Sequence, residues 1–128
     1  MFNPLSFLEL AEKLNSSKPI DSKEEATVRT VVSRAYYAAH LYVREKLRKI
    51  FPQELTDTAL RQQGRSEHAK VRSLLFKRGK REIADKHTEL FYLRVKADYK
   101  LIHQMHPRDA TKSISLAKRI IELSDRGV

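Results

Sequence analysis

Residues 90–105 have the spacing of an amphipathic helix, and two charged residues fall inside its apolar face. With Leu90 as the origin and about 100° per residue, Arg94 lies at about 40° and Asp98 at about 80°. The apolar residues of this arc are Leu93, Ala97, Leu101, Met105, Phe91, Ile102 and Val95. A charge left unpaired among them costs several kcal/mol. The fold must therefore bury Arg94 and Asp98 between helices or place them along a cleft.

Two helices are predicted in the first half of the chain. The Asn-Pro pair at 3–4 has the character of an N-cap followed by a first helical residue, and residues 15–19 end this helix. Ser22 with Glu25 three residues later is a capping-box signature. It opens a long second helix that Pro52 closes.

Residues 53–65 are weakly patterned and predict a short helical turn and a loop, after which three more helices follow. The signals that bound these elements are Gly64 and Gly79 as terminators, Ser66 and Asp109 as caps, and Pro107 as the residue that breaks the fourth helix after His106. Three glycines and four prolines leave little room for hairpins. The sequence predicts one all-α domain over residues 1–128, an up-and-down bundle of about five helices.

The charge of the chain favours a polyanionic partner. Lys and Arg number 26 against 16 Asp and Glu, a net charge of +10, for which solubility is the alternative explanation. The absence of cysteine excludes a disulfide framework, a thiolate zinc site and a cysteine nucleophile. No apolar run approaches the roughly 18 residues of a membrane span and no signal-peptide pattern occurs, so we expect a cytoplasmic protein without membrane contact. No His, Asp and Glu cluster has metal-ligand spacing, so we expect neither a metal nor another cofactor.

Basic residues gather in the stretch 61–81. Its eight members stand against Glu67 as the one acid; they are Arg61, Arg65, Lys70, Arg72, Lys77, Arg78, Lys80 and Arg81. Such density attracts phosphates and gives an affinity that depends on salt. The alternative is a solvated face whose Lys and Arg stems cover apolar surface. Aromatic interleaving, which favours base stacking, is absent here because Phe76 is the single ring.

A polar face is predicted on the second helix, opposite its Val and Ala stripe. Its members are Ser33, Arg34, Tyr37, His40 and Arg44. Hydroxyl, imidazole and guanidinium groups in one place suit phosphate binding or contact with a partner helix. An ordinary exposed helix face is the alternative.

His68 differs from these residues because it shares a helix face with Val71 and Leu75. A histidine in such a position is usually a core residue with its hydrogen bonds satisfied. The alternative is a histidine aimed into the cleft where Arg94 and Asp98 lie.

Three segments, in order, resemble the HEPN superfamily. They are SRAYYAAHLYVREKL on the second helix, His68 followed by Val71, and LRVKADYKL with a final helix ending AKRIIEL. The chain is most similar to the small stand-alone branch with Ser-x-x-Tyr-Tyr-Ala and Arg-x-x-Ala-Asp-Tyr helices. The resemblance implies a bundle of four to five helices that often forms a homodimer. It also implies a ribonuclease toxin with a cognate antitoxin, or a subunit beside a nucleotidyltransferase-like partner.

Ribonuclease members carry arginine, four to six residues, then histidine. Three spacings match, where chance gives roughly 1.5 in a chain of this composition, so the bare spacing decides nothing: Arg34 to His40, Arg61 to His68 and Arg81 to His87. At the segment most similar to the active motif, Tyr99 stands where histidine is expected after Arg94. In a metal-independent reaction Arg94 would hold the phosphate and His68 or His103 would act as base or acid. Asp98 would orient these groups, and Tyr99 and His103 would share a helix side.

Two functions and two roles of the charged pair stay open. The first function is an RNA-directed, metal-independent endoribonuclease of toxin–antitoxin or defence type. The second is a non-catalytic module that binds a nucleotide, RNA or a cognate protein. The pair Arg94 and Asp98 serves either as a phosphate site or as an internal ion pair that also bonds Tyr37 or Ser33 and sets the helix register.

Overall fold

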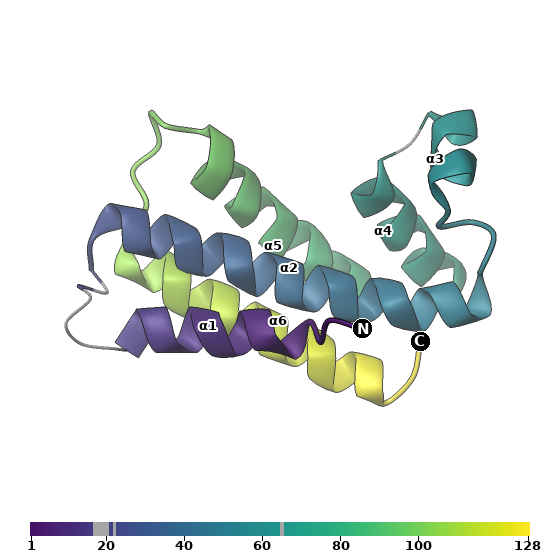
Figure 1. Cartoon of the computed structure of the whole chain (residues 1–128), viewed down its shortest axis with the longest axis horizontal. Coiled ribbons are helices and arrows are strands. Elements are labelled where there is room, and N and C mark those ends of the chain that lie inside the picture. Colours follow the sequence, from purple (N-terminus) through teal and green to yellow (C-terminus); the bar gives the residue numbers. More distant parts are fainter. Residues whose placement is uncertain (17–20, 22, 65) are drawn as a thin grey trace.

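The computed structural model describes residues 1–16, 21, 23–64 and 66–128 (Figure 1). These residues form six α-helices and no strand: α1 (Leu5–Ser16), α2 (Glu25–Ile50), α3 (Asp57–Gln63), α4 (Glu67–Lys77), α5 (Arg81–Tyr99) and α6 (Pro107–Asp125). The prediction of an all-α bundle is confirmed. None of the helices among the described residues has the length and apolar character needed to cross a bilayer.

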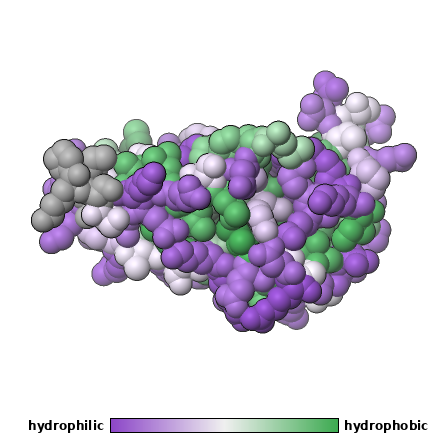
Figure 2. Space-filling view, turned by 60° about the horizontal axis from the view of Figure 1, so that its bottom comes forward, coloured by the Kyte–Doolittle hydropathy of each residue, from purple (hydrophilic) through white to green (hydrophobic). Residues whose placement is uncertain are grey.

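The long helix α2 forms the centre of the bundle. It packs against α1, α5 and α6, and α5 and α6 also pack against each other (Figure 1). The side chains of Val28, Val32 and Val43 on α2 are fully buried, as their helical spacing predicts. Burial of each contributes roughly 1.5–3 kcal/mol. On the face shown in Figure 2, hydrophilic residues surround several smaller apolar patches.

The helices α3 and α4 stand at one end of α2, and α4 packs against α2 and α5 (Figure 1). Gly64 ends α3 in the left-handed conformation at φ 61°, which a residue without Cβ adopts at little cost. The Ser66 hydroxyl accepts a hydrogen bond from the Ala69 N–H at 3.2 Å and so caps α4. Both boundaries agree with the sequence signals.

The predicted capping box at the start of α2 is wrong. The helix begins at Glu25 with Glu24 at the N-cap, so Glu25 is the first helical residue and not the third. Ser22 lies outside the described residues. The Glu25 carboxylate instead accepts hydrogen bonds from Arg29 and from the backbone N–H of Met105, at 3.0 Å each.

The prediction that the fourth helix continues to residue 106 is also wrong, because α5 ends at Tyr99. The Arg29 guanidinium reaches across from α2 and donates to the carbonyls of Lys96 at 2.8 Å, Ala97 at 3.0 Å and Lys100 at 3.3 Å. These are carbonyls at the end of the helix, and His103 in the following loop supplies a further acceptor.

Residues 100–106 therefore form a loop that turns the chain back into α6. Leu101 and Ile102, which the pattern placed on the apolar face, are 81% and 99% exposed, whereas Met105 is buried. Pro107 begins α6 as its first residue. Asp109 does cap this helix, but from its third position, where the carboxylate accepts from the His106 N–H at 2.8 Å.

Candidate functional site

Arg94 and Asp98 form an ion pair on α5. The Arg94 side chain is nearly buried, and its Nε lies 2.9 Å from Asp98 Oδ2. Its Nη2 donates a hydrogen bond to the Tyr37 hydroxyl at 2.7 Å and lies 3.4 Å from the Tyr99 hydroxyl. The cost of burying the guanidinium is offset by a carboxylate and by hydroxyl acceptors.

The pair also connects α5 to α2. Ser33 donates its hydroxyl to Asp98 Oδ2 at 3.3 Å and accepts from Arg34 Nη2 at 3.2 Å. Both cross-bundle contacts expected of an internal ion pair, to Tyr37 and to Ser33, are thus present. The pair is nevertheless not sealed from solvent, because an open groove borders Asp98. Its lining residues are Ala26, Arg29, Thr30, Ser33, Arg34, Ala97 and Asp98.

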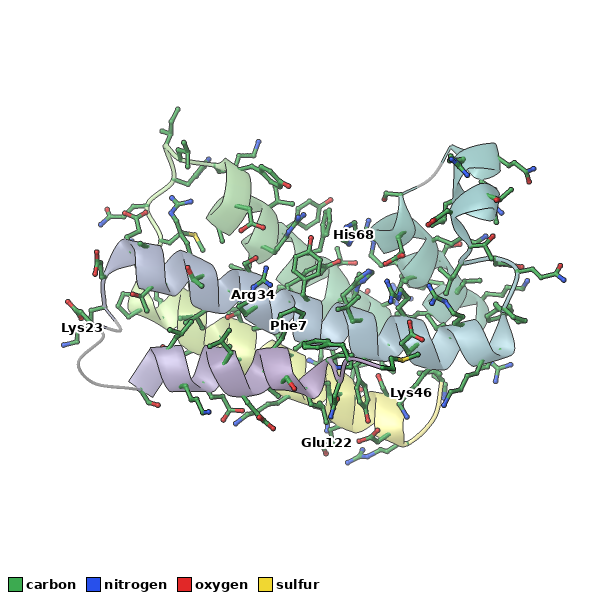
Figure 3. All side chains as sticks on the ribbon, in the orientation of Figure 1. Phe7, Lys23, Arg34, Lys46, His68 and Glu122 are labelled. Atoms are coloured by element: carbon green, nitrogen blue, oxygen red, sulfur yellow. The ribbon has the colours of Figure 1, made fainter. Side chains whose placement is uncertain are left out.

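Two guanidinium groups converge on the Tyr37 ring, and one of them, that of Arg34, lines this groove. The Cζ atoms of Arg94 and Arg34 lie 5.2 Å and 5.4 Å from the ring centroid. Arg34 also lies over the Phe7 ring at 4.8 Å (Figure 3). Asp98 compensates Arg94, but no carboxylate of the described residues pairs with Arg34. The arrangement therefore leaves a positive charge beside the groove.

His68 projects from the first turn of α4 toward α5 (Figure 3). Its Nδ1 is hydrogen-bonded to the Tyr36 hydroxyl, and its ring lies 5.3 Å from Phe91. Burial, together with the nearby charges of His40 and Arg94, lowers the pKa of His68 to about 4. The histidine is therefore neutral at pH 7 and partly buried. It shares the neighbouring rings Tyr36 and Tyr37 with Arg94.

Behind His68 lies a buried chain of polar side chains. His40 Nδ1 is 3.0 Å from His87 Nε2, and His40 Nε2 is 2.9 Å from Glu67 Oε1. Burial lowers the pKa of both His40 and His87, and the bond to His40 helps to hold the pKa of Glu67 at about 2. Arg44 also pairs with Glu67, at 3.2 Å.

These hydrogen bonds show that part of the predicted polar face of α2 is not free to bind phosphate. His40 is buried with both ring nitrogens engaged, which leaves neither for a phosphate. Arg44 is occupied by Glu67 and Glu45. The face is not an ordinary exposed one, because α4 and α5 cover it. Ser33 and Arg34 are its members that line the groove, and the Tyr37 ring contacts both Arg34 and Arg94.

The basic side chains of the stretch 61–81 have different partners in the structure. Lys70 and Lys77 direct their ammonium groups to Glu54, at 3.2 Å and 3.9 Å. Arg78 donates to the Val128 carbonyl at 2.8 Å. Arg72 lies over the Phe91 ring at 4.7 Å, and the same ring lies 5.3 Å from the His68 ring. Arg65, which was also expected to bind phosphate, lies outside the described residues.

The prediction that His103 and Tyr99 share a helix side is wrong. The helix α5 ends before it, and the His103 side chain is exposed on the loop. Its carbonyl accepts from Arg29. Tyr99 itself remains beside Arg94, so the two residues predicted to act together are separated by the end of the helix.

Three residues of the site were missed from the sequence: Tyr36, His87 and Arg29. His87 shares the α5 face of Ile83, Leu90 and Arg94, so helical spacing could have found it. Tyr36 stands inside the SRAYY motif beside Tyr37. Nothing in the local sequence indicates that Arg29 reaches the end of α5, because its acceptors lie 67 to 74 residues away in the chain.

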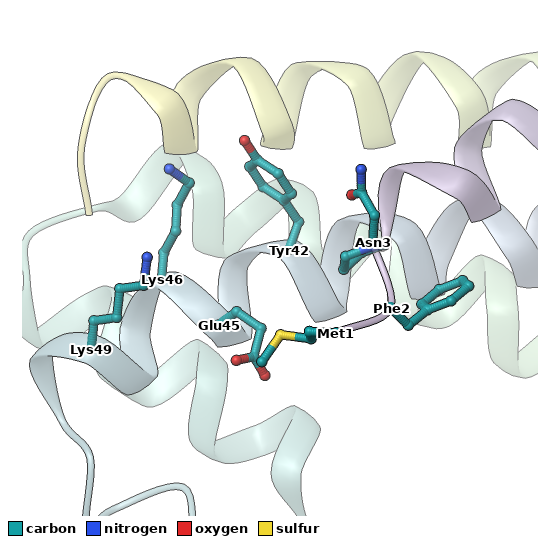
Figure 4. A pocket seen from close by; sticks show the side chains of 8 residues that line it. Met1, Phe2, Asn3, Tyr42, Glu45, Lys46 and Lys49 are labelled. Carbon is teal, nitrogen blue, oxygen red and sulfur yellow. The ribbon is translucent and has the colours of Figure 1, made fainter.

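A separate pocket lies between the N-terminal segment and the second half of α2 (Figure 4). Its lining residues are Met1, Phe2, Asn3, Pro4, Tyr42, Glu45, Lys46 and Lys49. The Tyr42 hydroxyl donates to Asp125, and Lys46 Nζ lies 3.3 Å from the same carboxylate. None of the predicted site residues lines this pocket.

Comparisons with known proteins identify one similar segment. Over 49 residues the chain is 49% identical to the uncharacterized protein MJ0628 of Methanocaldococcus jannaschii. The aligned segment makes up 38% of this chain and 28% of that protein, so the chain spans less than a third of its relative. No protein-family model and no solved structure matches the chain.

Proposed function

We propose that this protein is an RNA-directed member of the HEPN superfamily, and that the groove beside Arg94 receives an RNA phosphate. The observation that carries the proposal is the convergence of Arg94 and Arg34 on Tyr37 at the edge of an open groove. The guanidinium fork suits phosphate oxygens, and the net charge of +10 favours a polyanion. The sequence resemblance supports the same assignment.

The enzymatic form of this proposal is metal-independent cleavage of RNA. A neutral His68 takes the proton from a ribose 2′-OH, and the 2′ oxygen attacks the adjacent phosphorus. The bond from phosphorus to the 5′ oxygen breaks, that oxygen takes a proton from water, and a 2′,3′-cyclic phosphate remains. His68 then returns its proton to the solvent. Arg94 stabilises the charge on the phosphoryl oxygens, while Asp98 and Tyr37 hold its guanidinium in place. His68 serves as base when its Nδ1–H donates to Tyr36, because Nε2 then carries a free lone pair.

The second candidate is a non-catalytic module that binds RNA, a nucleotide or a cognate protein. One observation favours it. Burial raises the pKa of the Tyr36 hydroxyl, so this group keeps its proton, and it has His68 Nδ1 as an acceptor. When Tyr36 donates, His68 Nε2 carries a hydrogen and is a phosphate donor instead of a base. Tyr99 at the position of the expected histidine agrees with this candidate.

A cleavage assay with EDTA present tests the proposal. The substrate is a 5′-labelled single-stranded RNA of mixed sequence, and the DNA of the same sequence is the uncleavable control because it lacks the 2′-OH. We expect RNA cleavage with cyclic phosphate ends. Arg94→Ala should reduce the rate by about 10²–10³-fold, as for loss of a transition-state donor. His68→Ala should reduce it by about 10²–10⁴-fold, as for loss of a general base.

Arg119→Ala is the matched control. Arg119 lies on α6 and pairs with Glu82 in the first turn of α5, three helical turns before Arg94. Its loss removes the same charge and should leave cleavage unchanged. Circular dichroism shows whether each variant is folded. RNA binding without cleavage establishes the second candidate, and absence of both binding and cleavage contradicts an RNA-directed function. A homodimer, a cognate antitoxin and a nucleotidyltransferase-like partner belong to this proposal as implications of the resemblance.

A further inference from the structure

Two exposed tyrosines lie on either side of a lysine on the outer face of α5. Tyr92, Lys96 and Tyr99 are spaced i, i+4 and i+7, which places them on one face of the helix. Tyr92 is 60% exposed and Tyr99 is 65% exposed, and Lys96 between them is exposed as well. This is the aromatic interleaving that the basic stretch 61–81 lacks.

Tyr99 connects this stripe to Arg94. The Arg94 Cζ lies over the Tyr99 ring at 5.2 Å from its centroid. Because the residue is nevertheless mostly exposed, the other face of the ring is open to solvent. Tyr92 contacts Phe91 edge-on, with the ring planes at 70°, which also leaves a ring face free. Two ring faces are thus presented on either side of Lys96, and the nearly buried Arg94 lies against one of these rings, that of Tyr99.

We infer that α5 binds single-stranded RNA, with unpaired bases stacked on Tyr99 and Tyr92 and with phosphates at Arg94 and Lys96. This inference rests on the proposed function and specifies its substrate class. Stacking on aromatic side chains requires bases whose faces are not covered by a duplex. A base on the open face of Tyr99 completes a stack of Arg94, Tyr99 and base, so the phosphate site and the base site share one tyrosine.

The spacing of the two rings agrees with this arrangement. Seven residues of helix correspond to roughly 10 Å along the axis at about 1.5 Å per residue. A stacked strand advances about 3.4 Å per nucleotide, so this distance corresponds to about three base steps. A strand of a few nucleotides can therefore contact both tyrosines and pass Lys96 between them.

Charge selects RNA over a second copy of this chain as the occupant. A symmetric contact through α5 would bring Lys96 of each copy toward its mate, in a chain of net charge +10. Like charges brought together in this way are unfavourable. A polyanion instead gains from Lys96 and from the net charge of +10.

Fluorescence anisotropy with a labelled 12-nucleotide 2′-O-methyl RNA tests the inference, since this strand cannot be cleaved through its 2′ oxygen. Tyr99→Ala and Tyr92→Ala should each weaken binding about 5- to 100-fold, the range for loss of one stacked base. Tyr99→Phe keeps the ring and should bind within about twofold of wild type. Phe76→Ala, which removes an exposed ring from α4, is the matched control and should change nothing. The same strand annealed to its complement should bind more weakly than the single strand.

Several results would overturn the inference. Equal binding of single and double strands, or equal losses for Tyr99→Ala and Tyr99→Phe, exclude stacking. If Arg94→Ala abolishes binding while both tyrosine-to-alanine variants retain it, the inference fails and the proposed function stands. If the wild type binds no RNA, both fail. Light scattering gives the oligomeric state, and a wild-type dimer that Tyr99→Ala dissociates without weakening RNA binding identifies a second copy as the occupant.

Discussion

Arg94 lies nearly buried, with a compensating group on several sides of its guanidinium. The Asp98 carboxylate lies 2.9 Å from Nε, the Tyr37 hydroxyl 2.7 Å from Nη2, and aromatic rings flank the guanidinium. The same contacts join α5 to α2. A phosphate that binds here meets an arginine whose orientation is already fixed, which lowers the entropic cost of binding.

The buried histidines make the stability of the fold depend on pH. Burial lowers the pKa of His40 and His87, and that of His68 to about 4, whereas the unfolded residues titrate near 6.5. Below pH 6.5 the unfolded chain therefore binds more protons than the folded one, so the free energy of unfolding falls with falling pH. Urea unfolding between pH 7.5 and 5 should show this decline. His87→Leu should reduce its slope by up to about 1.4 kcal/mol per pH unit.

His103→Gln is the control for this measurement, because the His103 side chain is exposed on the loop after α5. Its slope should equal that of the wild type. A pH-independent free energy of unfolding over this range would show that the buried histidines do not remain neutral in the folded state.

The end of α5 is set by an arginine from α2. Arg29→Ala removes the donors to the carbonyls of Lys96, Ala97, Lys100 and His103. Because hydrogen bonds to charged groups contribute about 1.5–3 kcal/mol, we expect a loss of about 2–3 kcal/mol in the free energy of unfolding. Amide hydrogen exchange should accelerate over residues 97–105, which mass spectrometry of deuterated peptides measures.

Arg48→Ala is the matched control on the same helix. Arg48 forms a partly exposed pair with Glu45 at 3.2 Å, and such pairs contribute at most about 1 kcal/mol. Its exchange pattern over residues 97–105 should be unchanged. Equal effects of the two substitutions would mean that Arg29 contributes no more than an ordinary surface charge.

The helix boundaries show which features of the fold can be predicted from the sequence. The boundaries at Gly64 and Ser66 were predicted because their signals are local. The end of α5 was not, because apolar spacing continues through Met105 while the interaction that stops the helix comes from Arg29. The ion pair of the candidate site follows from helical spacing. The burial of His40 could not be predicted, because it depends on how α4 and α5 pack over α2.

Over the whole molecule, we expect the affinity for RNA to depend more on the position of each positive charge than on the net charge. The affinity for single-stranded RNA should fall with salt, with a slope of about 0.7 in log affinity against log salt for each phosphate contact. Arg34→Ala and Lys96→Ala should each lower this slope by about that amount. Lys70→Ala and Lys77→Ala should leave it unchanged, because both ammonium groups are directed to Glu54. Anisotropy titrations at several potassium chloride concentrations measure the slopes.

The reverse pattern, in which Lys70 and Lys77 govern the slope, would transfer the RNA path from α5 to the outer side of α4. A flat response to salt would contradict phosphate contact altogether. The oligonucleotide used for base stacking serves here as well, so both measurements refer to the same complex.

The loop at residues 100–106 is a suitable place to attach a label for studying the bound RNA strand. The chain contains no cysteine, and Ile102 is 99% exposed on a loop that Arg29 and Glu25 hold to α2. A single Ile102→Cys substitution therefore creates one thiol, close in sequence to Tyr99, for a fluorophore or a spin label. Energy transfer from this position to a dye at either end of a bound strand would report the direction in which the strand runs.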